Sequence, residues 1–456
     1  MKKEDLFKLL ADIDETSVEE AQHFHVEKKS KRKNRAFYGT LAALILLVIV
    51  GIPILGKITR SSTVMKVLAA GPEVLDYDKF CDDQMRKVAV SLQYKHGPAS
   101  YYSALMKEVL TAEDDNTVCS PLNTYLAFAM LAETCEGNTR KQILDMLGAA
   151  DIETVRKTAD ALWKANSANT PILTSLLGNS LWLNNRIAFN ETTLQTLAEQ
   201  YHASSFRGEA GSDKMNKALQ KWTDEATGGL LSDYVKDFKT TPNTVMALLS
   251  TLYFKAAWEN AFQPELTEPS VFHGTKGDTE VPMMHAVIPC DAGKTDRFSA
   301  VRIPLKGQES MIFYLPAEGI GVNDLLADPS ALNSVWRESY TSADLYLPKF
   351  KLSAKTDLLP VLEALGVTDA LDPSKADFSP LTAEKPLYVS KAEHAAAVEI
   401  DENGVTGAAY TVIVVDEAEF APVGPILLTF DRPFLFTVNG PDGSILFAGA
   451  VRNITE

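Results

Sequence analysis

The chain has 456 residues, of which 46% are hydrophobic and 23% charged, and its formal net charge at pH 7 is −16. This apolar share is typical of a chain with a substantial core, and it excludes bulk disorder and a collagen-like repeat. The acidic balance argues against nonspecific nucleic-acid binding, which needs a basic surface that displaces counterions from phosphates.

An uncharged run covers residues 36–56. As a helix it would be about 31 Å long, enough to cross the hydrocarbon core of a bilayer. Basic residues are dense within residues 28–35 and sparse after the run. The length and apolar character of this run predict a single-pass cell-membrane anchor. Because positive charge resists translocation, the basic side of the run is expected to stay inside the cell. Residues 1–35 would form a cytoplasmic basic tail, and the chain beyond about Lys57 would be extracellular.

Alternatives remain for this N-terminal part. A cleaved signal peptide, cut near residues 68–70, usually has a shorter leader than the 35 residues found here. A buried core helix would not need the flanking basic cluster. Residues 1–27 contain an amphipathic stretch, which is either a solvated tail or a segment that binds a cytoplasmic partner.

Residues 57–85 are interpreted as a tether and residues 86–456 as one domain. Helical periodicity dominates residues 98–165, whereas residues 178–183 and 245–254 are apolar on both faces, as in buried strands. The last thirty residues alternate strand and turn. Gly440-Pro-Asp-Gly443 predicts a hairpin between two apolar runs, and the whole pattern predicts an α+β fold.

One helix start is well specified. Ser120 can cap a helix whose first residue is Pro121, which lacks a backbone donor, and Gly137 suits its end. Thr139 with Gln142 predicts a capping box for the next helix.

The chain offers little that predicts catalysis or metal binding. Its four cysteines, Cys81, Cys119, Cys135 and Cys290, are too few for a disulfide scaffold and show no CxxC spacing. Cys119 and Cys135 are expected to be small buried residues. There is no HExxH, GxSxG, P-loop or GxGxxG motif. We therefore expect no enzyme, no cofactor and no metal site.

Several motifs, in a fixed order, resemble landmarks of the serpin family, whose members trap serine or cysteine proteases. The run 428–438 fits the family signature at every position. The resemblance covers residues 98–453 and implies a monomeric domain with a large central mixed sheet, further sheets, eight or nine helices and an exposed reactive-centre loop. The other matching segments are 119–123, 136–139, 179–182, 253–258, 281–284, 347–350, 377–379 and 390–394.

The resemblance also implies a mechanism for the loop. A protease cuts the loop and forms an acyl-enzyme, and the freed loop then inserts as a new central strand of the main sheet, carrying the protease with it. The family's hinge corresponds here to Glu402, Asn403, Gly404, Val405, Thr406, Gly407, Ala408 and Ala409.

Insertion requires that one alternating set of loop residues be uncharged and small or apolar, because it must face the core. Such a set exists: Val405, Gly407, Ala409, Thr411, Ile413 and Val415. Neither a charge nor a proline occurs between Val405 and Val415. An ordinary strand would show the same alternation, so the family position is what favours an inhibitor.

The loop departs from the usual family pattern at Asn403, Val405 and Tyr410. It is also several residues longer than usual, which widens the window for the cut. That window is Glu417, Ala418, Glu419, Phe420 and Ala421.

These side chains favour different target proteases. Alanine suits elastase-like or subtilisin-like enzymes, phenylalanine suits chymotrypsin-like ones, and glutamate suits a glutamate-specific enzyme. No basic residue lies between Glu402 and Thr429, which argues against trypsin-like targets.

In the family, a polar cluster under the main sheet controls its opening. The matching positions here are Ser120, Asn123, Ser250 and His394, and Trp258 matches the tryptophan where the loop enters. The family usually has serine where Asn123 stands and asparagine where Ser250 stands, so an exchange is expected to keep one amide and one hydroxyl near His394. Replacing Asn123 alone with serine would then leave His394 underbonded. The simpler alternative is that His394 and Trp258 are ordinary core residues.

Two functions remain in view. The first is an inhibitor that forms a covalent complex with its target. The second is a noninhibitory serpin that serves as a binding or signalling module at the cell surface.

Overall fold

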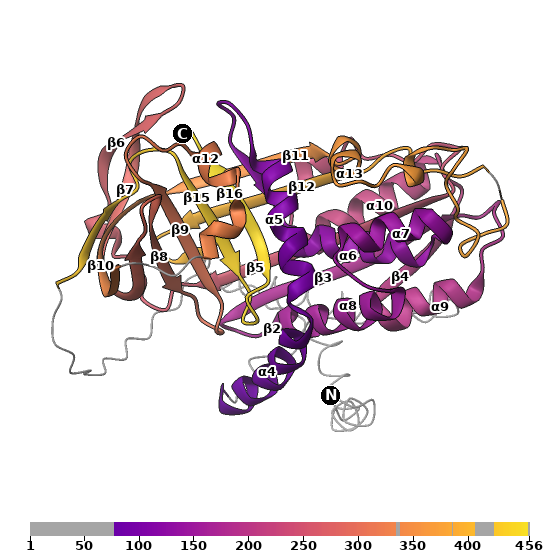
Figure 1. The fold of residues 1–456 in the computed structure, drawn as a ribbon, viewed down its shortest axis with the longest axis horizontal. Helices are drawn as coiled ribbons and strands as arrows, with labels where there is room; N and C mark the ends of the chain where they lie inside the picture. Colours follow the sequence, from indigo (N-terminus) through magenta and orange to yellow (C-terminus); the bar gives the residue numbers. More distant parts are fainter. Residues whose placement is uncertain (1–76, 334–337, 385, 406–423, 455–456) are drawn as a thin grey trace, which may run out of the picture. The chain divides into compact units, whose positions relative to one another are not determined.

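The computed structural model describes residues 77–333, 338–384, 386–405 and 424–454, all within the unit Ala69–Glu456 (Figure 1). The predicted anchor, residues 36–56, lies outside the described residues. Among the helices that the structure describes, none combines the length and the apolar character needed to span a bilayer.

The main sheet is mixed, as the resemblance implies. Its strands are β2 Ala168–Asn169, β3 Leu173–Asn184, β4 Ala203–Gly208, β5 Met246–Ala257, β11 Phe350–Asp357, β12 Glu393–Asp401 and β13 Gly404–Val405. They lie in the order β11-β12-β13-β5-β3-β2, and β4 pairs with β3 in parallel. The two runs predicted to be buried strands are confirmed as parts of β3 and β5.

A second sheet carries the C-terminal hairpin. Its strands are β1 Thr117–Cys119, β6 Glu268–Gly274, β7 Gly277–Lys294, β8 Phe298–Pro304, β9 Ser310–Pro316, β10 Glu338–Pro348, β14 Ile426–Thr429, β15 Phe434–Asn439 and β16 Ile445–Val451. The order is β1-β16-β15-β9-β8-β7-β10-β14, with β6 beside β7. The predicted hairpin is confirmed, since β15 and β16 pair antiparallel around a turn in which Gly443 has φ +81°.

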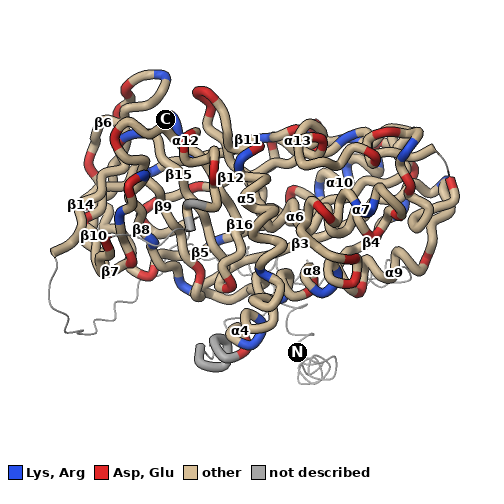
Figure 2. Tube along the Cα trace, viewed as in Figure 1, with Lys and Arg blue, Asp and Glu red and all other residues tan. Residues whose placement is uncertain are grey.

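The described residues form ten α-helices, more than the eight or nine that the resemblance implies, because single-turn segments count among them. They are α4 Tyr77–Ser91, α5 His96–Leu110, α6 Pro121–Glu133, α7 Gly137–Met146, α8 Ile152–Asn166, α9 Glu191–Gln200, α10 Asp213–Ala226, α11 Ser232–Val235, α12 Val322–Leu326 and α13 Leu359–Ala364. Four 3₁₀ segments, η1 to η4, cover Leu92–Tyr94, Pro264–Leu266, Pro329–Asn333 and Asp369–Leu371. Figure 2 shows that acidic and basic residues are interspersed along these elements.

Aromatic residues join the two sheets. The ring of Phe350, on β11 of the main sheet, lies 5.7 Å from the rings of Phe434 and Phe436 on β15 of the second sheet. Phe430 and Phe434 contact each other edge to face at 5.3 Å. Each buried phenylalanine contributes about 1.5–3 kcal/mol from burial alone, so this cluster holds the main sheet firmly at one end.

Residues 77–85, assigned from sequence to the tether, lie in α4. Gln84 is buried and donates to the carbonyl oxygen of Ala165 at the end of α8. Ser91 is also buried, and its hydroxyl donates to the carboxylate of Asp442 in the β15–β16 turn. These contacts attach α4 to the domain.

The helix caps are partly corrected. Ser120 does precede α6 and Pro121 does begin it, but the Ser120 hydroxyl donates to the carbonyl of Leu446 and caps nothing. The predicted capping box is wrong, because Thr139 lies inside α7, and its hydroxyl oxygen accepts a bond from the backbone of Asp377. The helix before it ends at Glu133, not at Gly137.

The Gln142 side chain also has a distant partner in place of a cap. Its oxygen accepts bonds from the backbone N–H groups of Thr368 and Asp369, at 3.0 and 2.8 Å. The partners of Thr139 and Gln142 are far away in the sequence. The local capping motif therefore could not predict that these two side chains bond to distant backbone groups and not to the ends of their own helix.

Cys119, Cys135 and Cys290 are free and buried, which confirms the expectation for the first two. Burial raises the pKa of Cys135 to about 12. Such thiols are inert, because the reactive form is the thiolate.

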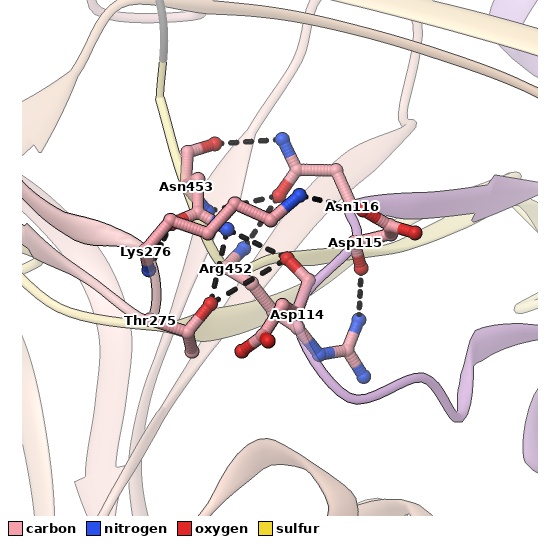
Figure 3. Close-up of polar contacts among 7 residues, drawn as sticks. All are labelled: Asp114, Asp115, Asn116, Thr275, Lys276, Arg452 and Asn453. Carbon is pink, nitrogen blue, oxygen red and sulfur yellow. Dashed lines mark hydrogen bonds and ion pairs between the residues drawn. The ribbon is translucent and has the colours of Figure 1, made fainter.

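The C-terminal residues Arg452 and Asn453 are held by a polar network with the 114–116 loop and the β6–β7 turn (Figure 3). The backbone N–H groups of Arg452 and Asn453 both donate to the side-chain oxygen of Asn116, at 2.7 and 2.9 Å. Arg452 is 2% exposed, and its guanidinium donates to the carbonyls of Asp115 and Leu110, each at 2.9 Å, and to the side-chain oxygen of Asn323 at 2.7 Å.

Replacing Arg452 with alanine is expected to lower the free energy of unfolding by about 3 kcal/mol, because the oxygens to which the guanidinium donates would stay buried without a hydrogen-bond donor. The matched control is Arg186→Ala, which removes a 64% exposed side chain paired with Glu209 and should cost under about 1 kcal/mol. Urea denaturation of the two variants measures the difference. Equal midpoints would contradict the assignment of Arg452 as a structural anchor.

Candidate functional site

The hinge is a tight turn that folds the chain back into the main sheet. Strands β12 and β13 pair antiparallel, with Asp401 opposite Gly404 and Ile400 opposite Val405. One oxygen of the Asp401 carboxylate accepts the N–H groups of Asn403 and Gly404, at 2.8 and 3.2 Å. This local bonding gives the turn its shape.

Glycine is the residue type that fits at position 404. Its φ is +152°, and a Cβ there would lie 2.2 Å from the carbonyl oxygen of Ala256. The backbone of β13 therefore approaches β5 closely, and it pairs with β5 through Gly404 opposite Ala257 and Val405 opposite Ala256.

Glu402, at the start of the turn, is held by side chains from outside the hinge. Its carboxylate lies 2.8 Å from the Lys349 ammonium and accepts the Thr267 hydroxyl at 2.9 Å. Burial opposes ionisation of Glu402, but the bonds from Lys349 and Thr267 still bring its pKa below the usual value. The ionised carboxylate of Glu402 therefore holds the start of the hinge in place through its bonds to Lys349 and Thr267.

Trp258 contacts the same turn through two hydrogen bonds. Its indole N–H donates to the carbonyl of Asp401 at 2.9 Å, and its backbone N–H donates to that of Asn403 at 3.0 Å. The side chain is 1% exposed. Trp258 is therefore a core residue that also contacts the turn, and its role in loop insertion stays a prediction.

Below Val405, the main sheet is open. Strands β12 and β5 are neighbours of β13, and no direct pairing links them among the described residues. A cavity of about 610 Å³ lies in this gap, lined by β5 residues 246–252, β12 residues 393–397, α6 beneath and the α10–α11 segment. Two strands separated by a third are roughly 9.5 Å apart, which is the width needed for one more strand.

The polar cluster predicted from the family lines this cavity. Ser120, Asn123, Ser250 and His394 all border it. The backbone N–H of Ser120 donates to Nε2 of His394 at 2.9 Å, and the hydroxyl of Ser250 is buried without a partner among the described residues. Burial lowers the pKa of His394 to about 4, so the imidazole is neutral at pH 7.

The proposed exchange of amide and hydroxyl needs correction in its detail. In the described part of the chain, the only bond to the His394 ring comes from the main chain of Ser120, not from Asn123 or Ser250. Asn123→Ser is therefore not expected to leave His394 underbonded. The four residues share the cavity wall, which is as far as the family correspondence holds.

Some predicted residues lie outside the described residues: Thr406, Gly407, Ala408 and Ala409 of the hinge, and Glu417, Ala418, Glu419, Phe420 and Ala421 of the cut window. Conversely, sequence reasoning missed Lys349, Thr267 and Asp401. Lys349 stood within a recognised motif but had no assigned role, because its partner Glu402 is 53 residues away.

Comparisons with known proteins agree with this geometry. A family model described as "Serpin (serine protease inhibitor)" matches residues 99–454. Alpha-1-antitrypsin of Meriones unguiculatus is 32% identical over 353 residues, covering 75% of this chain and 85% of that protein.

Solved structures are similar over most of the chain. Human thyroxine-binding globulin complexed with thyroxine is 26% identical, with a TM-score of 0.69 over 80% of this chain and 100% of that one. Native tengpin, a thermophilic serpin, is 24% identical and shares the fold, with a TM-score of 0.70 over 84% of this chain and 96% of that one. The chain belongs to the serpin family.

Proposed function

We propose that this protein is a suicide-type inhibitor of serine endopeptidases, with cysteine endopeptidases as the lesser option. A target protease cuts the loop within residues 417–421 and is held as an acyl-enzyme. The freed loop then inserts between β12 and β5 and carries the protease away before the ester hydrolyses. The composition of the window favours elastase-, subtilisin- or chymotrypsin-like targets.

The observation that carries this proposal is the open gap below β13. The hinge residues Gly404 and Val405 already pair with both neighbouring strands, and the cavity continues the line of β13 between the same strands. A sheet that is open in this way is suited to accept one more strand, whereas a closed sheet would first have to be separated.

The register of β13 supports the insertion further. Continued along the gap, the pairing of Val405 with Ile400 and Ala256 would bring Thr411 opposite His394 and Ser250. These three positions share the inner face, because direct partners in a sheet do. A threonine hydroxyl would then reach the unpartnered hydroxyl of Ser250, so the uncharged alternating set of the loop matches the inner wall.

A noninhibitory role is the alternative. The similar structure of human thyroxine-binding globulin was solved in complex with thyroxine, so that protein holds a small-molecule ligand on this fold. The departures at Asn403, Val405 and Tyr410 fit such a change of use. In that case, the protein would be a binding or signalling module whose loop is cut without trapping the protease.

The N-terminal region suggests where the inhibitor works. We propose that residues 36–56 anchor the chain in the cell membrane, with residues 1–35 in the cytoplasm and the serpin domain outside. Residues 1–27 would then be available to a cytoplasmic partner. An inhibitor held at the surface protects what lies close to it. Protease protection of intact cells tests this topology, since the domain would be digested and the tail preserved.

The decisive experiment mixes the purified full-length chain with pancreatic elastase, subtilisin and chymotrypsin. The expected result is a covalent band on a denaturing gel, at the summed mass of the chain and the protease less the mass of the C-terminal peptide that the cut releases. A released C-terminal peptide that begins between residues 418 and 423 should accompany it in mass spectra. Cleavage in the window without any covalent band would contradict inhibition and favour the binding module.

A further inference from the structure

Two large hydrophobic side chains stand out on the second sheet. Val287 on β7 is 60% exposed and Leu427 on β14 is 62% exposed, the highest values for large hydrophobic residues in the described ranges. Exposing apolar side chains to water is unfavourable in free energy. The residues that follow them, Ile288 and Leu428, point to the other face and are buried, so Val287 and Leu427 themselves do not belong to the core.

The strand register brings these side chains together. Asp344 on β10 is the direct partner of Val287 on one side and of Leu427 on the other, so the three share one row on one face. In the next row, Tyr346 pairs with His285, and their rings stack at 4.3 Å with an interplanar angle of 11°. We name these five residues the β7–β10–β14 patch.

The patch combines apolar surface with one carboxylate. His285 Nε2 lies 2.9 Å from the Asp344 carboxylate, which orients that group beside the stacked rings. The Asp344 side chain is 34% exposed, so part of it faces solvent. Such a surface fits a partner that presents an apolar side chain next to a lysine or arginine.

The patch lies next to the place where a protease must bind. Leu427 follows Ala421, the last residue of the cut window, by six positions, which limits their separation to about 20 Å. A protease of about 230 residues has a radius of gyration of about 17 Å. An enzyme that binds the window is therefore large enough to reach β14 and β10, which lie at one edge of the sheet (Figure 2).

From this placement, we propose that the β7–β10–β14 patch is a second docking surface for the target protease. It would contact the rim of the protease active site while the loop occupies the cleft, and so raise the rate at which the correct enzyme is captured. This inference rests on the proposed function in its choice of partner, but it concerns recognition and not trapping.

The test uses the full-length protein and the same three proteases. The double variant Val287→Asp with Leu427→Asp is compared with Met85→Asp, a control at a 54% exposed apolar residue on α4, which lies well away from β10 and β14 (Figure 2). A synthetic peptide with the sequence of residues 410–425 serves as the reference substrate, because it contains the window and lacks the patch. Should the double variant fail to fold in a thermal melt, Val287→Thr with Leu427→Thr replaces it.

The measured quantity is the second-order rate constant for cutting the loop, divided by that for cutting the peptide. We expect the patch variant to lower this ratio about tenfold for at least one protease, and the Met85 control to leave it unchanged. An unchanged ratio for all three enzymes overturns the proposal. It is also overturned if the parent protein is a dimer and the patch variant is a monomer, because the patch would then be an interface between two copies of the chain. The covalent fraction is scored separately, so a failure of inhibition is seen apart from a failure of docking.

Discussion

Replacing Ala409 with aspartate is expected to turn the protein from a trap into a substrate, cutting the ratio of trapped to released protease at least tenfold. In the register set by β13, residue 409 would insert opposite Ala396 and Leu252, which are 2% and 8% exposed on the inner face. A carboxylate there would be buried without a partner, which costs several kcal/mol. Insertion would slow, and the acyl-enzyme would hydrolyse first.

The neighbouring substitution Ala408→Asp is the matched control. It makes the same chemical change one residue earlier, where the opposing residues Ala397 and Tyr253 are half-buried on the other face. This variant should keep most of its covalent complex. Gel quantification after reaction with elastase, subtilisin and chymotrypsin compares the two. If Ala409→Asp traps as well as Ala408→Asp, either the register or the insertion is wrong.

Acidification is expected to weaken the domain by at most about 3 kcal/mol through His394. Burial lowers the pKa of His394 to about 4, compared with about 6.5 in the unfolded chain. Between these values, the unfolded state binds a proton that the folded state does not, so stability falls as pH falls from about 6.5 to about 4. Protonation would also remove the acceptor of the Ser120 N–H.

The measurement is the urea midpoint between pH 4 and 7.5 for the parent and for His394→Gln. Other groups titrate in this range in both proteins, so the difference between the two curves isolates His394. We expect the variant to be less stable at pH 7.5 and to lose less on acidification. Parallel curves would show that His394 does not couple protonation to stability.

Local pattern in the sequence determined much of this protein. Continuous apolar runs marked β3 and β5, and two apolar runs around a Pro-Asp-Gly turn marked the C-terminal hairpin, because each of these signals lies within a few neighbouring residues. The ordered motifs that resemble the serpin family predicted a hinge at residues 402–409, of which the structure describes residues 402–405. They also picked out Ser120, Ser250 and His394, which line one cavity in the structure.

Only the tertiary structure decided where polar side chains find their partners. Thr139 and Gln142 carried a capping signal but bond to the distant backbone of Asp377, Thr368 and Asp369. Likewise, Glu402 is fastened by Lys349 and Thr267, which no local pattern connects to it.

The open gap between β12 and β5 and the exposed row around Asp344 also depend on strand order and register. Strand order and register join segments that are far apart in the chain. Sequence therefore determined the elements and their periodicity, since these arise from neighbouring residues. The fold alone decided which long-range contacts each side chain makes, because packing selects among partners that are locally equivalent.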